Sequence, residues 1–148
     1  MLAIGASLAG ASHVVGLDAD PGALELAARN AATVGAGPIE WVLGDATRYP
    51  IACSGATVLS NPPFGAQHGN RHADRAFLET AAEIAAVSYT IHNENSRSFV
   101  DSFAADRDAT VTHAFRAPLP IANRFAFHTS DERTLDAEVF RIEWPDEP

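Results

Sequence analysis

Short apolar runs of strand length alternate with longer segments of helical periodicity along this chain. Apolar and β-branched residues standing together predict a strand, and apolar residues recurring three and four positions apart predict a helix. The predicted strands are 14–17, 39–43, 57–60, 87–91, 110–115 and 137–144, and the predicted helices are 21–34, 77–86 and 96–106. Such alternation predicts an α/β fold with an open, mostly parallel, doubly wound sheet.

The same periodicity predicts which side chains face the interior. Asp20 and Pro21 suit the start of a helix, and Gly35 and Gly37 suit its end. The apolar face of this helix is expected to hold Leu24, Ala27, Ala28, Ala31 and Val34. The run 57–60 is expected to be buried on both faces, and a Pro-containing loop with a polar stretch is expected between the last two strands. In the other two helices the residues expected to point inward are Phe77, Ala81, Ile84 and Ala85, and Phe99, Val100 and Phe103.

The charge balance is strongly acidic. Ten basic and 19 acidic residues give a net charge of -9, and every basic residue is an arginine. This is a poor electrostatic footprint for a nucleic-acid-binding protein. In about 1 M salt, however, the Debye length falls to about 3 Å, so repulsion between acids and phosphates is largely screened. The composition therefore favours a halophilic source. The alternative is a GC-rich genome that favours Ala and Arg codons, together with an ordinary acidic surface.

Length and cysteine content set the broad class. The 148 residues are expected to form a single domain, 1–148, with its own core. The lone Cys53 excludes an internal disulfide framework and predicts a reducing compartment, so a cytoplasmic location is expected. No His/Cys cluster has zinc spacing, and no apolar run is long enough to span a membrane. Neither a metal site nor a membrane anchor is therefore expected.

Three of the predicted strands end in a polar residue: Asp18, Asp45 and Asn61. In open α/β sheets, ligands bind at the carboxyl ends of the strands. A carboxylate at Asp18 can accept both ribose hydroxyls of a nucleoside cofactor. Asp45 can accept from an adenine amino group while the Ala46 N–H touches a ring nitrogen. Each acid alone is more often a turn or cap residue, but their order at successive strand ends is more specific than any one of them.

The segment Asn61-Pro62-Pro63-Phe64 has the chemistry to hold an exocyclic amine. Pro62 and Pro63 have a fixed φ and no N–H, so this turn offers carbonyl oxygens without competing donors. The Asn61 amide oxygen and the Pro62 carbonyl can both accept from an –NH2 group, which leaves the nitrogen lone pair free to attack. Phe64 can stack on the base that carries the amine. The plain alternative is a Pro-rich turn after a strand.

These residues resemble the class I S-adenosylmethionine-dependent methyltransferases. The closer resemblance is to the archaeal and eukaryotic family that methylates an adenosine N6 in small-subunit ribosomal RNA. The segments that carry it are 1–5, 14–24, 61–65, Asp74 with Phe77, 88–92, Phe127 with His128, and 136–139. The resemblance implies a Rossmann-like methyltransferase fold and direct methyl transfer to an amine held by Asn61 to Phe64.

The resemblance also implies site residues and partners. The residues implied to bind S-adenosyl-L-methionine are Asp18, Ala19, Asp45, Ala46 and Asn61. His92 and His128 are weaker candidates for the substrate side, because a hydrogen-bonded structural histidine explains each at least as well. The implied partners are RNA and, as in eukaryotic members, a small zinc-binding activator subunit. With the acidic composition, the archaeal members favour a halophilic archaeon as the source.

The chain departs from the family pattern at several places. Asn93 replaces a usual Lys, and 129–132 replaces usual basic residues, which weakens the expected RNA surface. The family begins with an apolar strand and an Asp-x-Gly-x-Gly-x-Gly loop, which have no counterpart before Gly5. The domain is therefore expected to lack the strand that normally lies between the first and third strands seen here. A start recorded too late, a decayed gene and a strand supplied by another chain all stay open.

Other functions share part of this pattern. DNA adenine methylases use a similar Pro-Pro-aromatic segment but usually carry a separate target-recognition region. Protein glutamine methylases favour Tyr at the fourth position, where this chain has Phe64. A truncated, non-catalytic remnant or interaction module is the alternative from a different class. Cofactor binding would separate the remnant from the enzymes.

Overall fold

The computed structural model describes residues 1–63, 73–121 and 133–145. The chain forms two compact units, Met1–Cys53 and Ser54–Pro148. The expectation that 1–148 is one methyltransferase domain stays a prediction. Two candidate site residues, Phe64 and His128, lie outside the described residues.

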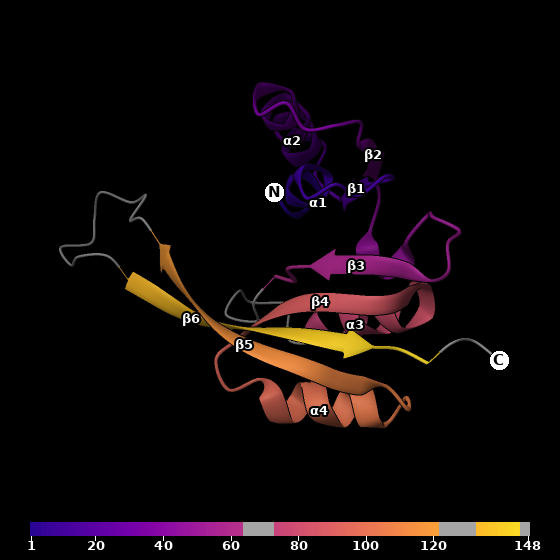
Figure 1. Cartoon of the computed structure of the whole chain (residues 1–148), viewed down its shortest axis with the longest axis vertical. Helices are drawn as coiled ribbons and strands as arrows, with labels where there is room; N and C mark the ends of the chain where they lie inside the picture. Colours follow the sequence, from indigo (N-terminus) through magenta and orange to yellow (C-terminus); the bar gives the residue numbers. More distant parts are fainter. Residues whose placement is uncertain (64–72, 122–132, 146–148) are drawn as a thin grey trace. The chain divides into compact units, whose positions relative to one another are not determined.

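The first unit contains two parallel strands and two α-helices (Figure 1). In chain order its elements are α1 (Leu2–Leu8), β1 (Val15–Asp18), α2 (Pro21–Thr33), β2 (Glu40–Leu43) and the short 3-10 helix η1 (Ala46–Arg48). In the pairing of β1 with β2, Gly16 lies opposite Trp41. A Cβ atom at position 16 would collide with the indole ring. The Trp41 indole therefore occupies the space that a side chain at position 16 would need, and glycine leaves that space open.

Helix α2 ends in the way its sequence predicts. Gly35 has a φ of +67°, a left-handed conformation that glycine adopts at little cost. Its N–H donates to the Ala32 carbonyl, and the next N–H, from Ala36, donates to the Ala31 carbonyl. These two bonds satisfy carbonyls that the helix itself leaves unpaired. Ala31 is buried as expected, but Val34, just beyond the helix, is 53% exposed.

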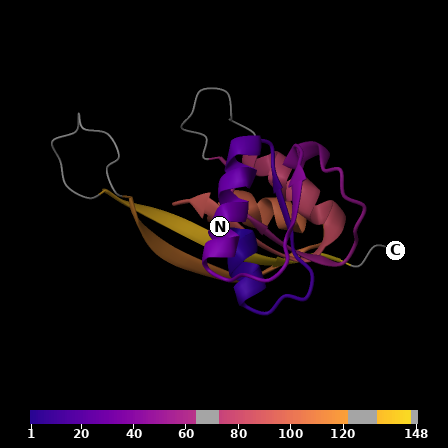
Figure 2. The ribbon, with the colours of Figure 1, turned by 90° about the horizontal axis from the view of Figure 1, so that it is seen from above.

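The second unit is a four-stranded sheet with the order β3-β4-β6-β5. Its elements are β3 (Ala56–Ser60), α3 (Ala73–Ile84), β4 (Ala85–Asn93), α4 (Arg97–Ala105), β5 (Thr110–Ile121) and β6 (Arg133–Glu143). Strands β3 and β4 are parallel, whereas β6 is antiparallel to both β4 and β5. Figure 2 shows β5 and β6 extending together beyond the helices of this unit.

The core of the second unit lies between the sheet and helices α3 and α4. Alternate residues of β6 point into it, and Phe140 and Ile142 have no exposed surface. The helix residues packed in the same cluster are Leu78, Ala81, Val100, Phe103 and Ala104. The inward positions predicted for Ala81, Val100 and Phe103 are thus confirmed. Leu78 also belongs to this core, although the sequence analysis did not predict it.

Three local expectations were wrong. Strand β3 is not buried on both faces, because Thr57 and Leu59 are exposed. Phe99 is 36% exposed and so only partly covered, although one side of its ring meets His92 and Phe103. Strand β5 continues through Pro118 and Pro120, where a loop was expected. Because β5 is at the edge of the described sheet, a proline that cannot donate a hydrogen bond is tolerated there.

The predicted fold class is confirmed in its main feature, the alternation of strands and helices. The pairs β1-β2 and β3-β4 are parallel, and the antiparallel β5 and β6 make the second sheet mixed. Helix α1 contains residues 2–5 of the segment 1–5, which carries part of the resemblance. Within the described ranges, no helix is both long and apolar enough to cross a bilayer.

The start of α2 gives a test of the local structure. The Asp20 side chain accepts a hydrogen bond from the Gly22 N–H at 2.8 Å, and Pro21 occupies the first turn. We expect Asp20→Ala to lower the free energy of unfolding by about 1 kcal/mol, because this N–H loses its partner. Asp20→Asn keeps an acceptor and should cost much less. Urea unfolding followed by circular dichroism measures both, and equal losses would contradict the capping role.

Candidate functional site

Two acidic side chains stand at adjacent strand ends in the first unit. Asp18 is the last residue of β1, and Asp45 follows Gly44 at the end of β2. The Gly44 N–H donates to the Asp18 carbonyl oxygen at 3.0 Å, so the two segments are in direct contact. Ala19 and Ala46 come next after the two acids. The structure thus brings together the four residues of this unit for which the sequence predicts cofactor binding.

Both carboxylates also shape the turns in which they lie. One oxygen of Asp18 accepts from the Asp20 N–H at 2.9 Å, and one oxygen of Asp45 accepts from the N–H and the hydroxyl of Thr47, each at 2.8 Å. The backbone bond from Thr47, then its hydroxyl and the charge of Arg48, hold the pKa of Asp45 below its ordinary value of 3.8. Asp45 is therefore an anionic hydrogen-bond acceptor at neutral pH.

The segment predicted to hold the amine, Asn61-Pro62-Pro63-Phe64, is described as far as Pro63 and follows β3 in the second unit. Pro62 is fully buried, whereas Asn61 and Pro63 are exposed. The buried ring anchors the turn, so the neighbouring Asn61 is held at the surface of the strand end. This placement leaves the Asn61 amide accessible to a ligand. That Asn61 shares one site with Asp18 and Asp45 stays a prediction.

His92 lies in the interior of the second unit, with no exposed side-chain surface. Its Nε2 atom is 2.9 Å from the Thr90 hydroxyl, which accepts a hydrogen bond from the Ser60 hydroxyl at 3.1 Å. Its Nδ1 atom is 3.8 Å from a carboxylate oxygen of Asp74. Burial lowers the pKa of His92, and the nearby charges of Asp74 and then Glu138 oppose this shift only in part. This environment favours a neutral imidazole and the structural reading of His92.

Sequence reasoning did not find the polar contacts around His92. One signal was present: the serine, threonine and histidine at 88, 90 and 92 alternate with apolar residues in β4, so they share one face of the strand. All three are completely buried. Polar residues on the covered face of a strand need partners. The pattern could therefore have indicated a buried polar network, although not its members.

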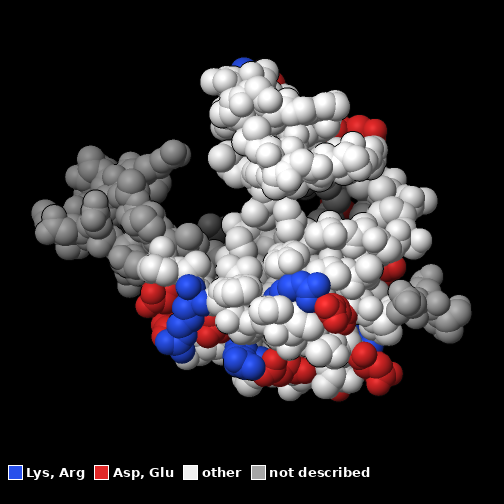
Figure 3. Space-filling view, viewed as in Figure 1, with Lys and Arg blue, Asp and Glu red and all other residues white. Residues whose placement is uncertain are grey.

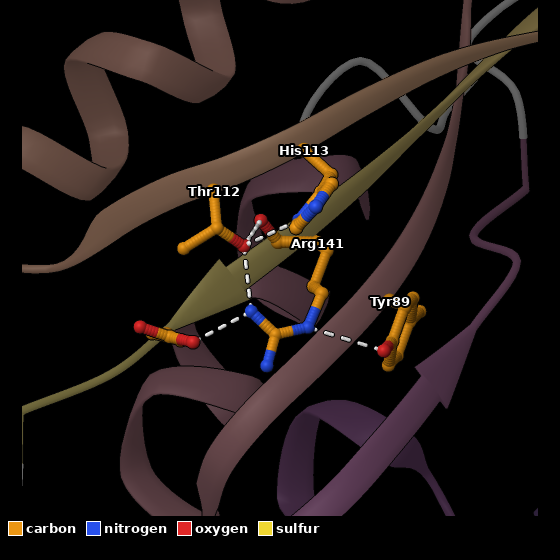
Figure 4. Close-up of polar contacts among 5 residues, drawn as sticks. Tyr89, Thr112, His113 and Arg141 are labelled. Atoms are coloured by element: carbon orange, nitrogen blue, oxygen red, sulfur yellow. Dashed lines mark hydrogen bonds and ion pairs between the residues drawn. The ribbon is translucent and has the colours of Figure 1, made fainter.

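A second polar cluster surrounds Arg141 on β6 (Figure 4). Its Nε atom donates to the Tyr89 hydroxyl at 3.1 Å, and Nη1 donates to the Thr112 hydroxyl and to Glu143, each at 2.6 Å. Thr112 lies where the register of β5 shifts against β6. The bond to Glu143, followed by that to Tyr89, raises the pKa of Arg141. This guanidinium is thus occupied by partners within the sheet.

The arginines of the second unit whose side chains the structure describes each lie near a carboxylate. Figure 3 shows arginine and acidic side chains side by side on one face of this unit. The arginines found within 4.0 Å of a carboxylate are Arg75, Arg97, Arg107, Arg116 and Arg141. Such pairing leaves little positive field for attracting phosphate. No group of three or more potential metal ligands occurs among the residues that the structure describes.

Comparison with known proteins identifies the relatives of the chain. No protein-family model matches it. The uncharacterized protein MJ0284 of Methanocaldococcus jannaschii is 33% identical over 156 residues, covering 96% of this chain and 68% of that protein. The rRNA N(6)-adenosine-methyltransferase METTL5 of Danio rerio is 33% identical over 147 residues, covering 96% of this chain and 70% of that protein.

A solved structure shows the same fold. The crystal structure of PH1948 from Pyrococcus horikoshii superposes with a TM-score of 0.81 at 30% identity, covering 97% of this chain and 69% of that one. The match includes nearly the whole chain, and so it includes the strand ends that carry Asp18 and Asp45 and the strand end that carries Asn61. This chain therefore belongs to the S-adenosylmethionine-dependent RNA methyltransferases.

Proposed function

We propose that this chain methylates the N6 amine of an adenine in RNA, with ribosomal RNA as the expected substrate. The observation that carries the proposal is the exposed Asn61 at the carboxyl end of β3, held by the buried Pro62. The relationship to the Danio rerio enzyme, whose name states rRNA N(6)-adenosine methylation, supports the choice of substrate.

The strand ends of the first unit fit the chemistry of S-adenosyl-L-methionine. Asp18 would accept from the ribose hydroxyls, and the anionic Asp45 would accept from the amino group of the cofactor's adenine. Ala19 and Ala46 follow these acids, and the N–H of Ala46 would donate to a ring nitrogen. The cofactor supplies a methyl group on a positively charged sulfur, which is reactive without a metal. The chain therefore mainly positions the reacting atoms.

Asn61 and Pro62 would act on the target amine. The Asn61 side-chain oxygen and the Pro62 carbonyl accept its two N–H groups, which aims the nitrogen lone pair at the methyl carbon. As positive charge develops on that nitrogen, both acceptors stabilise it more strongly than they stabilise the starting amine. Pro63 offers no competing donor, and Phe64 would stack on the base. The adenine must be unpaired or flipped out of a helix to reach these groups.

Several finer expectations remain part of this proposal. They are the small zinc-binding activator subunit, the cytoplasmic location and the halophilic archaeal source. A substrate-side role for His128 also stays a prediction. The same role for His92 is disfavoured by its complete burial.

Asn61 provides the most direct test of the mechanism. We expect Asn61→Ala to lower kcat for RNA methylation by about 100-fold or more, because a donor–acceptor contact made in the transition state is lost. Cofactor affinity, measured by calorimetry, should change little. Asn93→Ala is the matched control, since Asn93 is also an exposed asparagine at a strand end. Equal losses in kcat and cofactor affinity for Asn61→Ala would contradict the role.

Asp18 provides a separate test of cofactor binding. In Asp18→Asn the amide oxygen can still accept from the Asp20 N–H, but the negative charge that would hold the ribose hydroxyls is lost. We expect cofactor affinity to fall about 10- to 100-fold, the usual range for a hydrogen bond to a charged group. Asp20→Asn is the control, and calorimetric titration measures both. Unchanged affinity in Asp18→Asn would place the ribose elsewhere.

A further inference from the structure

We propose that a buried chain of contacts, Ser60–Thr90–His92–Asp74, acts as a clamp on both ends of the segment that carries Asn61. Ser60 directly precedes Asn61 at the end of β3, and Asp74 lies in the first turn of α3. Thr90 and His92 of β4 connect them. The inference rests on the proposed function, because it makes these four side chains positioning residues for the same Asn61.

The contacts form one continuous path through the interior. The Ser60 hydroxyl donates to the Thr90 hydroxyl at 3.1 Å, and that hydroxyl is 2.9 Å from His92 Nε2. On the far side of the ring, Nδ1 is 3.8 Å from Asp74. Thr90 and His92 have no exposed surface, and Ser60 is 9% exposed. Because water has almost no access to these three side chains, they depend on their neighbours for hydrogen bonding, whereas the Asp74 side chain is 29% exposed.

The path has a consistent direction when His92 is neutral. Ser60 donates to Thr90, so the Thr90 hydroxyl proton is available for His92 Nε2. Nε2 is then the acceptor, and the ring proton lies on Nδ1, facing the carboxylate of Asp74. Every donor along the path therefore points toward Asp74. A positively charged His92 would instead donate from Nε2 and break this order at Thr90.

The surroundings of His92 favour the neutral ring. The rings of Phe99 and Phe140 lie against it, with centroids 6.3 Å and 5.8 Å away. Two acids face it: Asp74 from α3, and Glu138 opposite it on β6. Glu138 is already engaged, since it accepts from the Ser96 N–H at 3.0 Å and pairs with Arg116 at 4.0 Å. Asp74 is thus the carboxylate available to complete the path.

The contact at the Asp74 end is not closed. His92 Nδ1 and Asp74 Oδ1 are buried atoms without a hydrogen-bond partner among the described residues, and the carboxylate oxygen that faces Nδ1 is the other one, Oδ2. A separation of 3.8 Å exceeds hydrogen-bond length by about 1 Å. The Asp74 end is therefore the weakest contact of the path.

The test breaks the path at Thr90. Thr90→Val has almost the same shape but cannot connect Ser60 to His92. The matched control is Ser88→Ala, two residues earlier on the same buried face, where the hydroxyl accepts from the Trp144 indole at 2.9 Å and does not touch the path. Both changes leave a buried donor unpaired, so both lose stability. Thr90→Ser restores the hydroxyl.

Two measurements on the full chain distinguish the outcomes. We expect Thr90→Val to lower kcat for RNA methylation about 10- to 100-fold with unchanged cofactor affinity. Thr90→Ser should recover most of the lost kcat, and the kcat of Ser88→Ala should stay near the parent value. Independently of activity, amide hydrogen exchange at Asn61 and in the first turns of α3 should accelerate about tenfold in Thr90→Val and not in Ser88→Ala. Equal exchange in the two variants would overturn the clamp. If exchange accelerates in Thr90→Val as expected but the parent protein methylates no RNA, the clamp stands and only the proposed function is overturned.

The protonation state of His92 gives a further prediction. Burial lowers the pKa of His92 from its ordinary value of 6.5, so below pH 6.5 the unfolded chain binds a proton more readily than the folded chain. The stability contributed by the neutral ring is therefore present above pH 6.5 and lost as the pH falls through the lowered pKa. Urea midpoints measured against pH should show this loss in the parent and not in His92→Asn. Parallel curves would show that folding does not shift the pKa of His92.

Discussion

The second unit depends on the burial of polar side chains within an apolar strand. Strand β4 lies between β3 and β6, and its serine, threonine and histidine face the helix-covered side without exposed surface. Each meets a residue of another segment: Ser88 with Trp144, Thr90 with Ser60, and His92 with Asp74. Because buried polar groups need partners, these contacts select which segments lie beside β4 and in what register. Apolar packing alone would tolerate more arrangements.

Much of this fold could be predicted because local signals and tertiary packing agree. Asp20 begins α2 and Gly35 ends it, as the chemistry of each residue predicts. The alternation of strands and helices likewise predicts the parallel pairing of β1 with β2 and of β3 with β4. Prediction failed where tertiary position decides the outcome. Pro118 reads as a loop residue in isolation, yet it lies in an edge strand that needs no hydrogen bond from it. Leu59 reads as buried, yet exposure depends on what covers that face.

The candidate site divides in the same way. Asp18, Asp45 and Asn61 could be predicted because a strand end is a local feature, and the polar residue that follows it can be read directly from the sequence. The path through His92 could not be predicted, because Ser60 and Thr90 are 30 positions apart in the sequence and meet only through strand pairing. Whether a buried histidine serves a ligand or the framework depends on such contacts. Residues at strand ends can therefore be read from the sequence more readily than the side chains that hold them in place.

The paired arginines of the second unit have a consequence for how quickly an RNA could be found. Each guanidinium near a carboxylate contributes little to the long-range field, and the chain as a whole carries a net charge of -9. Phosphate is then repelled at a distance instead of being attracted. Encounter would proceed without steering, at roughly 10⁵–10⁶ M⁻¹s⁻¹ or below. Added salt would speed such an encounter by screening the repulsion, the reverse of the usual behaviour of nucleic-acid-binding proteins.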